Sequence, residues 1–194
     1  MKRTIMTFLV TLLSVIALSQ TSSGTWNNAT ATYTNVKHGI TWTLIEGLDW
    51  IGRPILTEST LLKVRNDDNH IMVTLGVQRT NSDVGDIWDY LPMYNTEQYL
   101  DMAKAEARRN DMVFQYVKAV KSQLCGKHAN KIKTVMTKYY SEYKTTIHSV
   151  NYQYQSVSGG YVYTLGILGL SVREDELADF DRIVANIING FIIK

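Results

Sequence analysis

The sequence predicts an α+β fold, in which an antiparallel sheet packs against helices and a C-terminal β-hairpin is followed by an amphipathic helix. Three observations support this prediction. The run Tyr152–Gln155 alternates aromatic and polar side chains, which is the period of a β-strand. Gly159 and Gly160 then supply the positive φ angles that a tight hairpin turn requires. After Arg173, apolar residues recur at helical spacing and form one continuous stripe.

Residues 1–19 have the three-part pattern of a secretory signal peptide. Lys2 and Arg3 give a positive start, an apolar run follows to Leu18, and small residues around Ser19 fit a cleavage site. A buried N-terminal helix is the alternative, but it does not require this order of charge, apolar run and small residues. We therefore expect an exported protein, periplasmic or extracellular, whose mature chain begins at Gln20.

Charge and cysteine content limit the classes of partner. The whole chain carries 20 basic and 18 acidic residues, and loss of Lys2 and Arg3 with the signal peptide leaves 18 of each. A chain without net charge is not expected to bind nucleic acid or an anionic membrane surface as its main partner. The single cysteine, Cys125, cannot form an intrachain disulfide, so we expect the core to supply the stability.

The mature chain is expected to form a short flexible lead, residues 20–28, and then a single α+β domain, residues 29–194. Strands are predicted at residues 38–46, 61–65 and 71–77, and a turn at residues 66–69. These early strands are interpreted as an antiparallel meander. Ile40, Trp42 and Leu44 should lie on one face of the first of them.

A helix is predicted to begin after Asn95, where Gln98 would complete a capping box, and to end near Arg109. A short helical turn before it should end at Pro92. Residues 112–143 fit helices by their apolar spacing but are rich in Thr, Val, Ile and Tyr. We favour strands for much of this region, because the C-terminal hairpin needs neighbours in a sheet.

The C-terminal hairpin and helix are the clearest elements. Strands are predicted at residues 145–155 and 161–170, with a bulge or a close backbone approach at Gly166 and Gly169. The helix should span residues 173–191, with Ser171 as N-cap and Glu174 at the third helical position. Its apolar stripe should pack on the sheet.

No catalytic, cofactor-binding or metal-binding residue is predicted. The four histidines are not spaced as metal ligands, and each is interpreted as a surface or structural residue. Cys125 has no recognisable thiol-enzyme signature around it, so we interpret it as a small buried apolar residue rather than a nucleophile. The sequence also contains no Gly-x-Ser-x-Gly elbow and no phosphate-binding glycine loop.

A cluster of tyrosines is the candidate partner-binding feature. Seven of the 12 tyrosines fall within 25 positions of the chain. Such a cluster can fill one face of a sheet, which we favour, or can present an adhesive surface to a partner protein or a sugar. The seven residues are Tyr139, Tyr140, Tyr143, Tyr152, Tyr154, Tyr161 and Tyr163.

The order of elements resembles the PsbP-like proteins, the extrinsic photosystem II protein and its secreted bacterial relatives. The features that carry the resemblance are an early Gly-aromatic strand, a hairpin with Gly-x-x-Tyr, and a terminal amphipathic helix. In this chain they correspond to residues 39–42, 160–165 and 180–184. The resemblance covers most of residues 33–191. It implies a non-enzymatic binding or assembly role and transfers no catalytic residue.

Taken together, these patterns predict an exported, non-enzymatic binding or assembly module. The alternative is a secreted hydrolase whose site is assembled from residues distant in sequence, since catalytic groups meet in space rather than along the chain. That alternative requires a deep pocket that holds at least two His, Asp or Glu side chains.

Overall fold

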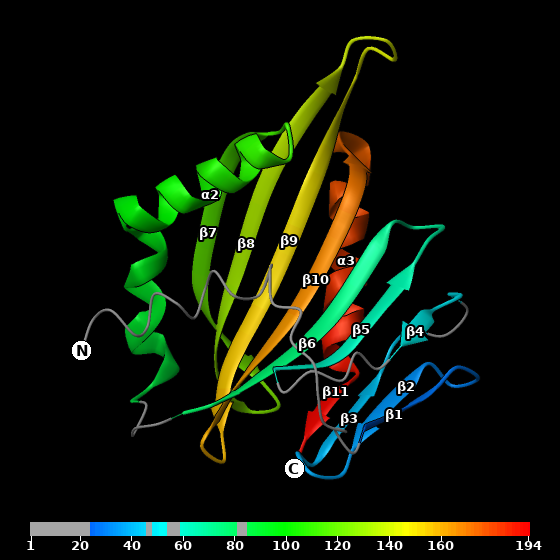
Figure 1. The fold of residues 1–194 in the computed structure, drawn as a ribbon, viewed down its shortest axis with the longest axis vertical. Helices are drawn as coiled ribbons and strands as arrows, with labels where there is room; N and C mark the ends of the chain where they lie inside the picture. Colours follow the sequence, from blue (N-terminus) through cyan, green and yellow to red (C-terminus); the bar gives the residue numbers. More distant parts are fainter. Residues whose placement is uncertain (1–23, 46–47, 54–58, 81–84) are drawn as a thin grey trace.

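A computed structural model describes residues 24–45, 48–53, 59–80 and 85–194. The predicted signal peptide lies outside these residues. The described strands form two antiparallel sheets, one of seven strands and one of four (Figure 1). The predicted α+β class is therefore confirmed.

The large sheet has the order β4-β5-β6-β10-β9-β8-β7, with β10 and β9 near its centre. All of its strand pairs are antiparallel. Its strands, in this order, are Ile51–Arg53, Thr60–Asn66, Ile71–Arg79, Tyr161–Arg173, Thr145–Ser158, Lys127–Tyr140 and Val113–Leu124. The small sheet has the order β1-β2-β3-β11. Its strands are Gly24–Asn27, Thr32–Asn35, Ile40–Thr43 and Phe191–Ile193.

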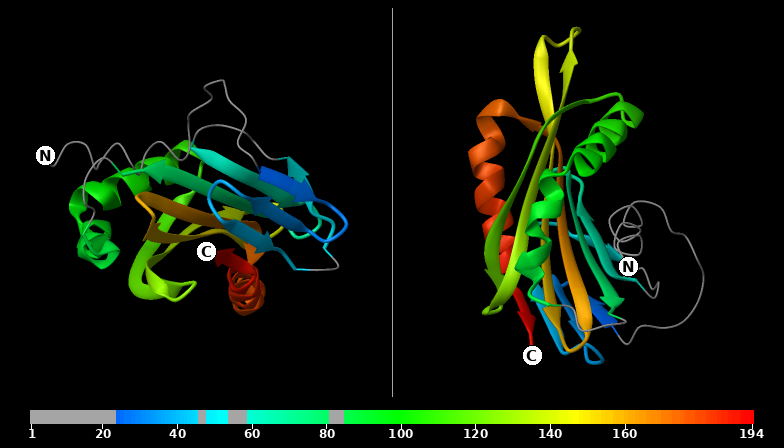
Figure 2. Two further views of the ribbon diagram at one scale, coloured as in Figure 1. Left: turned by 90° about the horizontal axis from the view of Figure 1, so that it is seen from below. Right: turned by 90° about the vertical axis from the view of Figure 1, so that its left-hand side faces the viewer.

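Helices lie on both faces of the large sheet. The helix α3 (Leu177–Asn189), which follows the 3-10 turn η2 (Glu174–Glu176), covers one face. The 3-10 helix η1 (Ile87–Asn95) and the helix α2 (Glu97–Arg109) lie on the opposite side (Figure 2, right). We name these faces the α3 face and the α2 face.

The core lies between α3, the α3 face of the large sheet and the small sheet. Phe180, Val184 and Ile187 of α3 are buried in it, which confirms that the apolar stripe packs on the sheet. Trp42 of β3 joins the small sheet to α3, because its indole N–H donates to the carbonyl oxygen of Ile187 at 2.8 Å. Ile40, Trp42 and Leu44, which were predicted to share one face, are all buried.

The C-terminal hairpin forms as the sequence predicts. Gly159 and Gly160 have φ angles of +57° and +75°, so the turn uses the left-handed conformation at both positions. The predicted close approach at Gly169 is confirmed, since a Cβ there would lie 2.6 Å from Cζ of Phe180. The predicted close approach at Gly166 is likewise confirmed, because a Cβ there would lie 2.5 Å from Oγ1 of Thr74.

The region that fitted both helices and strands consists of two long strands, β7 and β8. Cys125 and Gly126 join them and have φ angles of +53° and +74°. Cys125 is exposed at this turn, so its interpretation as a buried residue was wrong. Cys125 lies in the turn between β7 and β8 and belongs to neither strand, so the sheet does not cover it.

Two predicted helix caps are corrected. The N-cap of α2 is Thr96 rather than Asn95, because Oγ1 of Thr96 accepts the N–H of Tyr99 at 3.3 Å. Ser171 does not cap the last helix: it has a φ of +60° at an irregularity of β10. The backbone N–H of Arg173 instead donates to Oε2 of Glu176 at 3.0 Å.

Two boundaries were also wrong. The predicted lead, residues 20–28, includes β1, whose residues pair with β2; residues 20–23 lie outside the described part. The helix η1 continues through Pro92 to Asn95. The early strands, expected to form one meander, divide between the two sheets.

Candidate ligand-binding site

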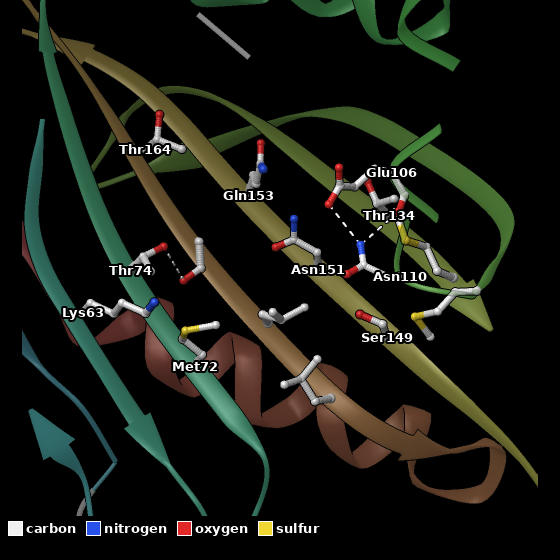
Figure 3. Close-up of a pocket in the computed structure, with 15 residues that line it drawn as sticks. Lys63, Met72, Thr74, Glu106, Asn110, Thr134, Ser149, Asn151, Gln153 and Thr164 are labelled. Atoms are coloured by element: carbon white, nitrogen blue, oxygen red, sulfur yellow. Dashed lines mark hydrogen bonds between the residues drawn. The ribbon is translucent and has the colours of Figure 1, made fainter. Parts of the chain in front are cut away.

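An open hollow lies on the α2 face of the large sheet, beside the C-terminal end of α2 (Figure 3). Its volume is about 370 Å³. Side chains from β5, β6, β10, β9 and β8 line its floor, and the end of α2 forms one wall. The hollow therefore spans the two central strands and lies opposite the face that α3 covers.

The floor is made mainly of uncharged hydrogen-bonding side chains. Ser149, Asn151 and Gln153 alternate along β9 and point to this face, while the residues between them point to α3. Thr134 of β8 and Thr164 of β10 lie on either side of this row. Amides and hydroxyls both donate and accept hydrogen bonds, so this floor can bind a polar ligand that has no charge.

The remaining lining residues are mostly apolar. Met72, Met136 and Met112 contribute flexible thioether side chains, which adapt to irregular surfaces. Leu168 and Leu170 extend the apolar part along β10. The hollow thus offers apolar contact next to its row of polar groups, a combination typical of ligand sites.

Charged side chains in the hollow are few and stand at its margins. Lys63 of β5 lies on one side, and Glu106 of α2 lies on the other (Figure 3). Oε1 of Glu106 accepts the side-chain N–H of Asn110 at 3.0 Å, and its Oε2 lies 3.3 Å from Nη1 of Arg109. Because Glu106 is already partnered within its own helix, the centre of the floor stays uncharged.

Gly166 lies in the middle of the floor, where Thr74 packs against its backbone. The hydroxyl of Thr74 on β6 donates to the carbonyl oxygen of Gly166 at 3.5 Å. The close approach of Thr74 leaves no room for a Cβ at Gly166. A glycine inside a central strand contributes no side chain to the packing. It is expected where another group comes close to the backbone.

The lower part of the same face is closed by η1. The hydroxyl of Tyr94 donates to Oε1 of Gln155, and Nδ2 of Asn130 donates to the carbonyl oxygen of Ile87 at 2.7 Å. Burial raises the pKa of Tyr94, which keeps its hydroxyl protonated and able to donate. These polar residues are therefore used inside the protein, whereas the side chains of Ser149, Asn151 and Gln153 form no hydrogen bond with another described residue.

The structure does not bring the seven tyrosines together. Tyr152, Tyr154 and Tyr163 are buried on the α3 face, and Tyr161 is partly exposed beside Tyr163. Burial raises the pKa of Tyr154 to about 12. The other three lie at the far end of the β8–β9 hairpin. They are Tyr139 and Tyr143, both exposed, and Tyr140, which is partly exposed.

Tyr152 has a structural partner in α3. Its hydroxyl donates to Oδ1 of Asp181 at 2.6 Å, and Nζ of Lys133 lies 2.9 Å from the same carboxylate oxygen. Burial first, and then this hydrogen bond, raise the pKa of Tyr152. These contacts fasten α3 to β8 and β9.

The histidines occupy separate places. The ring of His128 stacks on Trp88 with a centroid distance of 3.4 Å, and its Nδ1 lies 2.5 Å from Oδ2 of Asp86. Nε2 of His148 lies 2.7 Å from Oε2 of Glu174. Among the residues that the structure describes, no group of three or more His, Cys, Asp or Glu side chains is placed to hold a metal ion. Nor does any helix of this part have the length and apolar character needed to cross a membrane.

Sequence reasoning did not identify the hollow, although the sequence of β9 contains the polar residues that form it. The alternation along β9 predicted a face of aromatic residues. The opposite, polar face includes Asn151 and Gln153, which form part of the floor. Polar residues on one face of a strand indicate only that this face does not pack against the hydrophobic core. Their place beside α2, Met112 and Gly166 follows from the arrangement of the elements.

No known family model matches the chain, and no curated protein does either. The structure is similar to that of cyanobacterial PsbP (CyanoP) from Synechocystis sp. PCC 6803, with a TM-score of 0.53 and 12% identity over 94% of this chain and 99% of that one. It is also similar to LpqN, involved in cell envelope biogenesis of Mycobacterium tuberculosis, with a TM-score of 0.43 and 14% identity over 80% of this chain and 83% of that one.

A third similar structure is the Ran-binding protein Mog1p of Saccharomyces cerevisiae. Its TM-score is 0.45 and its identity 9%, over 81% of this chain and 92% of that one. At these identities the similarity concerns the fold. The similarity to CyanoP, whose TM-score is above 0.5, shows a PsbP-like fold, in agreement with the resemblance in the sequence.

Proposed function

We propose that the protein is an exported, non-enzymatic binding module and that its ligand site is the hollow on the α2 face. The ligand that fits best is an uncharged molecule with many hydrogen-bonding groups and some apolar surface. The observation that carries this proposal is the row of Ser149, Asn151 and Gln153, which lies open on a central strand of the sheet.

The contrast between the two ends of the α2 face supports this assignment. Where η1 covers the sheet, Asn130 and Gln155 bind groups of the protein itself. In the hollow, Asn151 and Gln153 lie on β9, the same strand as Gln155, but no residue of η1 is among those that line the hollow around them. A ligand in the hollow would form hydrogen bonds with Asn151 and Gln153, as η1 does with Asn130 and Gln155 further along the same face of the sheet.

The alternative of a secreted hydrolase gains less support from this hollow. A hydrolytic site needs a nucleophile or an activated water and a base that is within hydrogen-bond reach. Among the residues that the structure describes, Glu106 is the only His, Asp or Glu side chain that lines the hollow, and Arg109 and Asn110 already contact it. The Asp86–His128 pair lies elsewhere, against Trp88.

The proposal is tested by affinity capture with the mature protein. The immobilised protein is incubated with the periplasmic fraction or culture medium of its native host, and the bound material is compared with that of an Asn151→Ala/Gln153→Ala variant. The wild type is expected to retain a saturable ligand that the variant does not retain. Gln115→Ala on β7 is the matched control, because its amide contacts Thr137 outside the hollow.

Equal capture by the wild type and the floor variant would contradict the assignment to the hollow. Chemical turnover of the captured material by the wild type would contradict the non-enzymatic role. Thermal unfolding of each variant shows that the substitutions have not changed the fold itself.

A further inference from the structure

The strand β7 forms one edge of the large sheet and has an unpaired side. It is 12 residues long, and among the described strands it pairs with β8 alone. Among the described residues, no other backbone segment forms a hydrogen bond with it. A long edge with free N–H and C=O groups is a template for another strand, unless its side chains prevent the pairing.

The side chains of β7 select which strand can be added. Tyr116, Lys118 and Val120 all point to the α3 face, because they lie opposite Val135, Lys133 and Lys131 of β8. Tyr116 is 45% exposed and Val120 is 37% exposed. The outer edge therefore presents a positive side chain between two apolar ones on a single face.

Positive charge is concentrated around this edge. Residues 113–140 contain six lysines and no Asp or Glu. Lys133 is paired with Asp181, and Lys138 with Asp111. Lys131 lies over the rings of Tyr152 and Tyr154, and no carboxylate of the described residues lies within ion-pair distance of Lys118 or Lys131.

A second copy of β7 is a poor partner for this edge. In a register that sets Lys118 of one copy opposite Lys118 of the other, two such strands would repel each other, because like charges on adjacent strands destabilise a sheet. The β-bulge between Phe114 and Tyr116 also bends the strand. Lysines and bulges at an edge discourage self-association, but they leave the edge open to a chain of opposite charge.

We propose that β7 binds an extended acidic peptide segment, which adds to the sheet as an eighth strand. The segment would place a carboxylate opposite Lys118 and apolar side chains opposite Tyr116 and Val120, in an apolar–x–acidic–x–apolar pattern. Backbone hydrogen bonds give affinity in this mode of recognition, and the alternate side chains give specificity. This surface is separate from the hollow, so the protein would have two independent binding surfaces.

The test measures the binding of fluorescent peptides by anisotropy at low salt. The probe is an acetylated peptide in which Val-Thr-Glu-Thr is repeated three times, so that Val and Glu share one face. We expect saturable binding that weakens as salt is added. A peptide with Lys in place of Glu, and a peptide with the original sequence but methylated on alternate backbone nitrogens, should not bind.

Two variants locate the contact. Lys118→Glu should weaken binding by about tenfold or more, since it replaces attraction with repulsion at an exposed contact. Lys37→Glu makes the same charge change on an exposed residue after β2 and should leave the affinity within about twofold of the wild type. Asn151→Ala/Gln153→Ala should also bind the peptide normally, which separates this surface from the hollow.

Three outcomes would overturn the proposal. The first is equal binding of the methylated peptide, because strand addition needs its N–H groups. The second is equal weakening by Lys37→Glu and Lys118→Glu, which would mean that only net charge matters. The third is the absence of binding by the acidic probe, or a dimer in solution whose interface maps to β7.

Discussion

Phe180 of α3 packs directly against Gly169 of β10 in the large sheet. Its side chain is 4% exposed, and its ring occupies the space where a side chain on Gly169 would lie. We expect Phe180→Ala to lower the free energy of unfolding by about 3–5 kcal/mol, because the change removes apolar burial and leaves a cavity. Urea unfolding measures this loss directly.

Asp179 provides the matched control for Phe180. It is the preceding residue on the exposed side of α3 and pairs with Arg182, also exposed. Asp179→Ala should change stability by about 0.5 kcal/mol or less, since exposed ion pairs contribute little. A loss from Phe180→Ala no larger than that from Asp179→Ala would show that the stripe of α3 does not face a core.

At the scale of elements, the turn between β9 and β10 is determined by backbone conformation alone. Gly159 has a positive φ, and a Cβ built on it would meet no atom within 4 Å. Gly159→Asn should therefore change stability by about 0.5 kcal/mol or less, because Asn tolerates this conformation. Gly159→Val should cost about 1–2 kcal/mol, since a β-branched residue is strained there.

Thermal or urea unfolding of both variants checks the origin of the effect. Neither substitution removes packing contacts at this exposed turn. The difference in stability between Gly159→Val and Gly159→Asn therefore measures backbone strain. Equal stabilities of the two variants would show that the turn does not need the left-handed conformation.

The strands and the turn were predictable because local chemistry decides them. Alternation along β9 and the pair Gly159-Gly160 specify a hairpin whatever surrounds it. The helix caps were less predictable, because several residues near the start of a helix can serve as its N-cap. Thr96 rather than Asn95 starts α2, and the irregularity at Ser171 displaces the start of the last helix.

The hollow was not predictable at this scale. The position of α2 over β7 and β8 depends on contacts of η1 such as Tyr94 with Gln155, which join residues 61 positions apart. Such contacts leave no periodic signal in the sequence. The exposure of Cys125 was missed for a related reason, since it depends on where β7 ends.

At the scale of the whole molecule, the buried tyrosines make stability sensitive to alkaline pH. Burial raises the pKa values of Tyr94, Tyr152 and Tyr154 in the folded protein above the value of about 10 for an unfolded chain. Their protonated forms are favoured by folding, so this stability is complete below pH ~10 and is lost as pH rises above it. Each should lower the free energy of unfolding by about 1.4 kcal/mol per pH unit in that range.

Tyr154→Phe tests this dependence. The substitution removes one buried titrating hydroxyl, so urea unfolding of the variant at several alkaline pH values should show a shallower loss of stability than the wild type. Tyr143→Phe changes an exposed hydroxyl and should leave the slope unaltered. A slope that Tyr154→Phe does not reduce would contradict the raised pKa.

Export is tested on the protein from its native host. Mass spectrometry of the intact mature chain should give a mass that begins at Gln20, since residues 1–19 carry the pattern of a signal peptide. Recovery of the chain with residues 1–19 still attached would contradict the proposed extracytoplasmic location.

The most direct test of the proposed ligand site is site-specific photocrosslinking in the native host. A benzophenone amino acid is placed at Asn151, on the floor of the hollow, or at Ala185, which is exposed on α3 at the other side of the sheet. The proposal predicts a crosslinked ligand from position 151 and none from position 185. No adduct at position 151, or equal adducts at both positions, would contradict a ligand site on the α2 face.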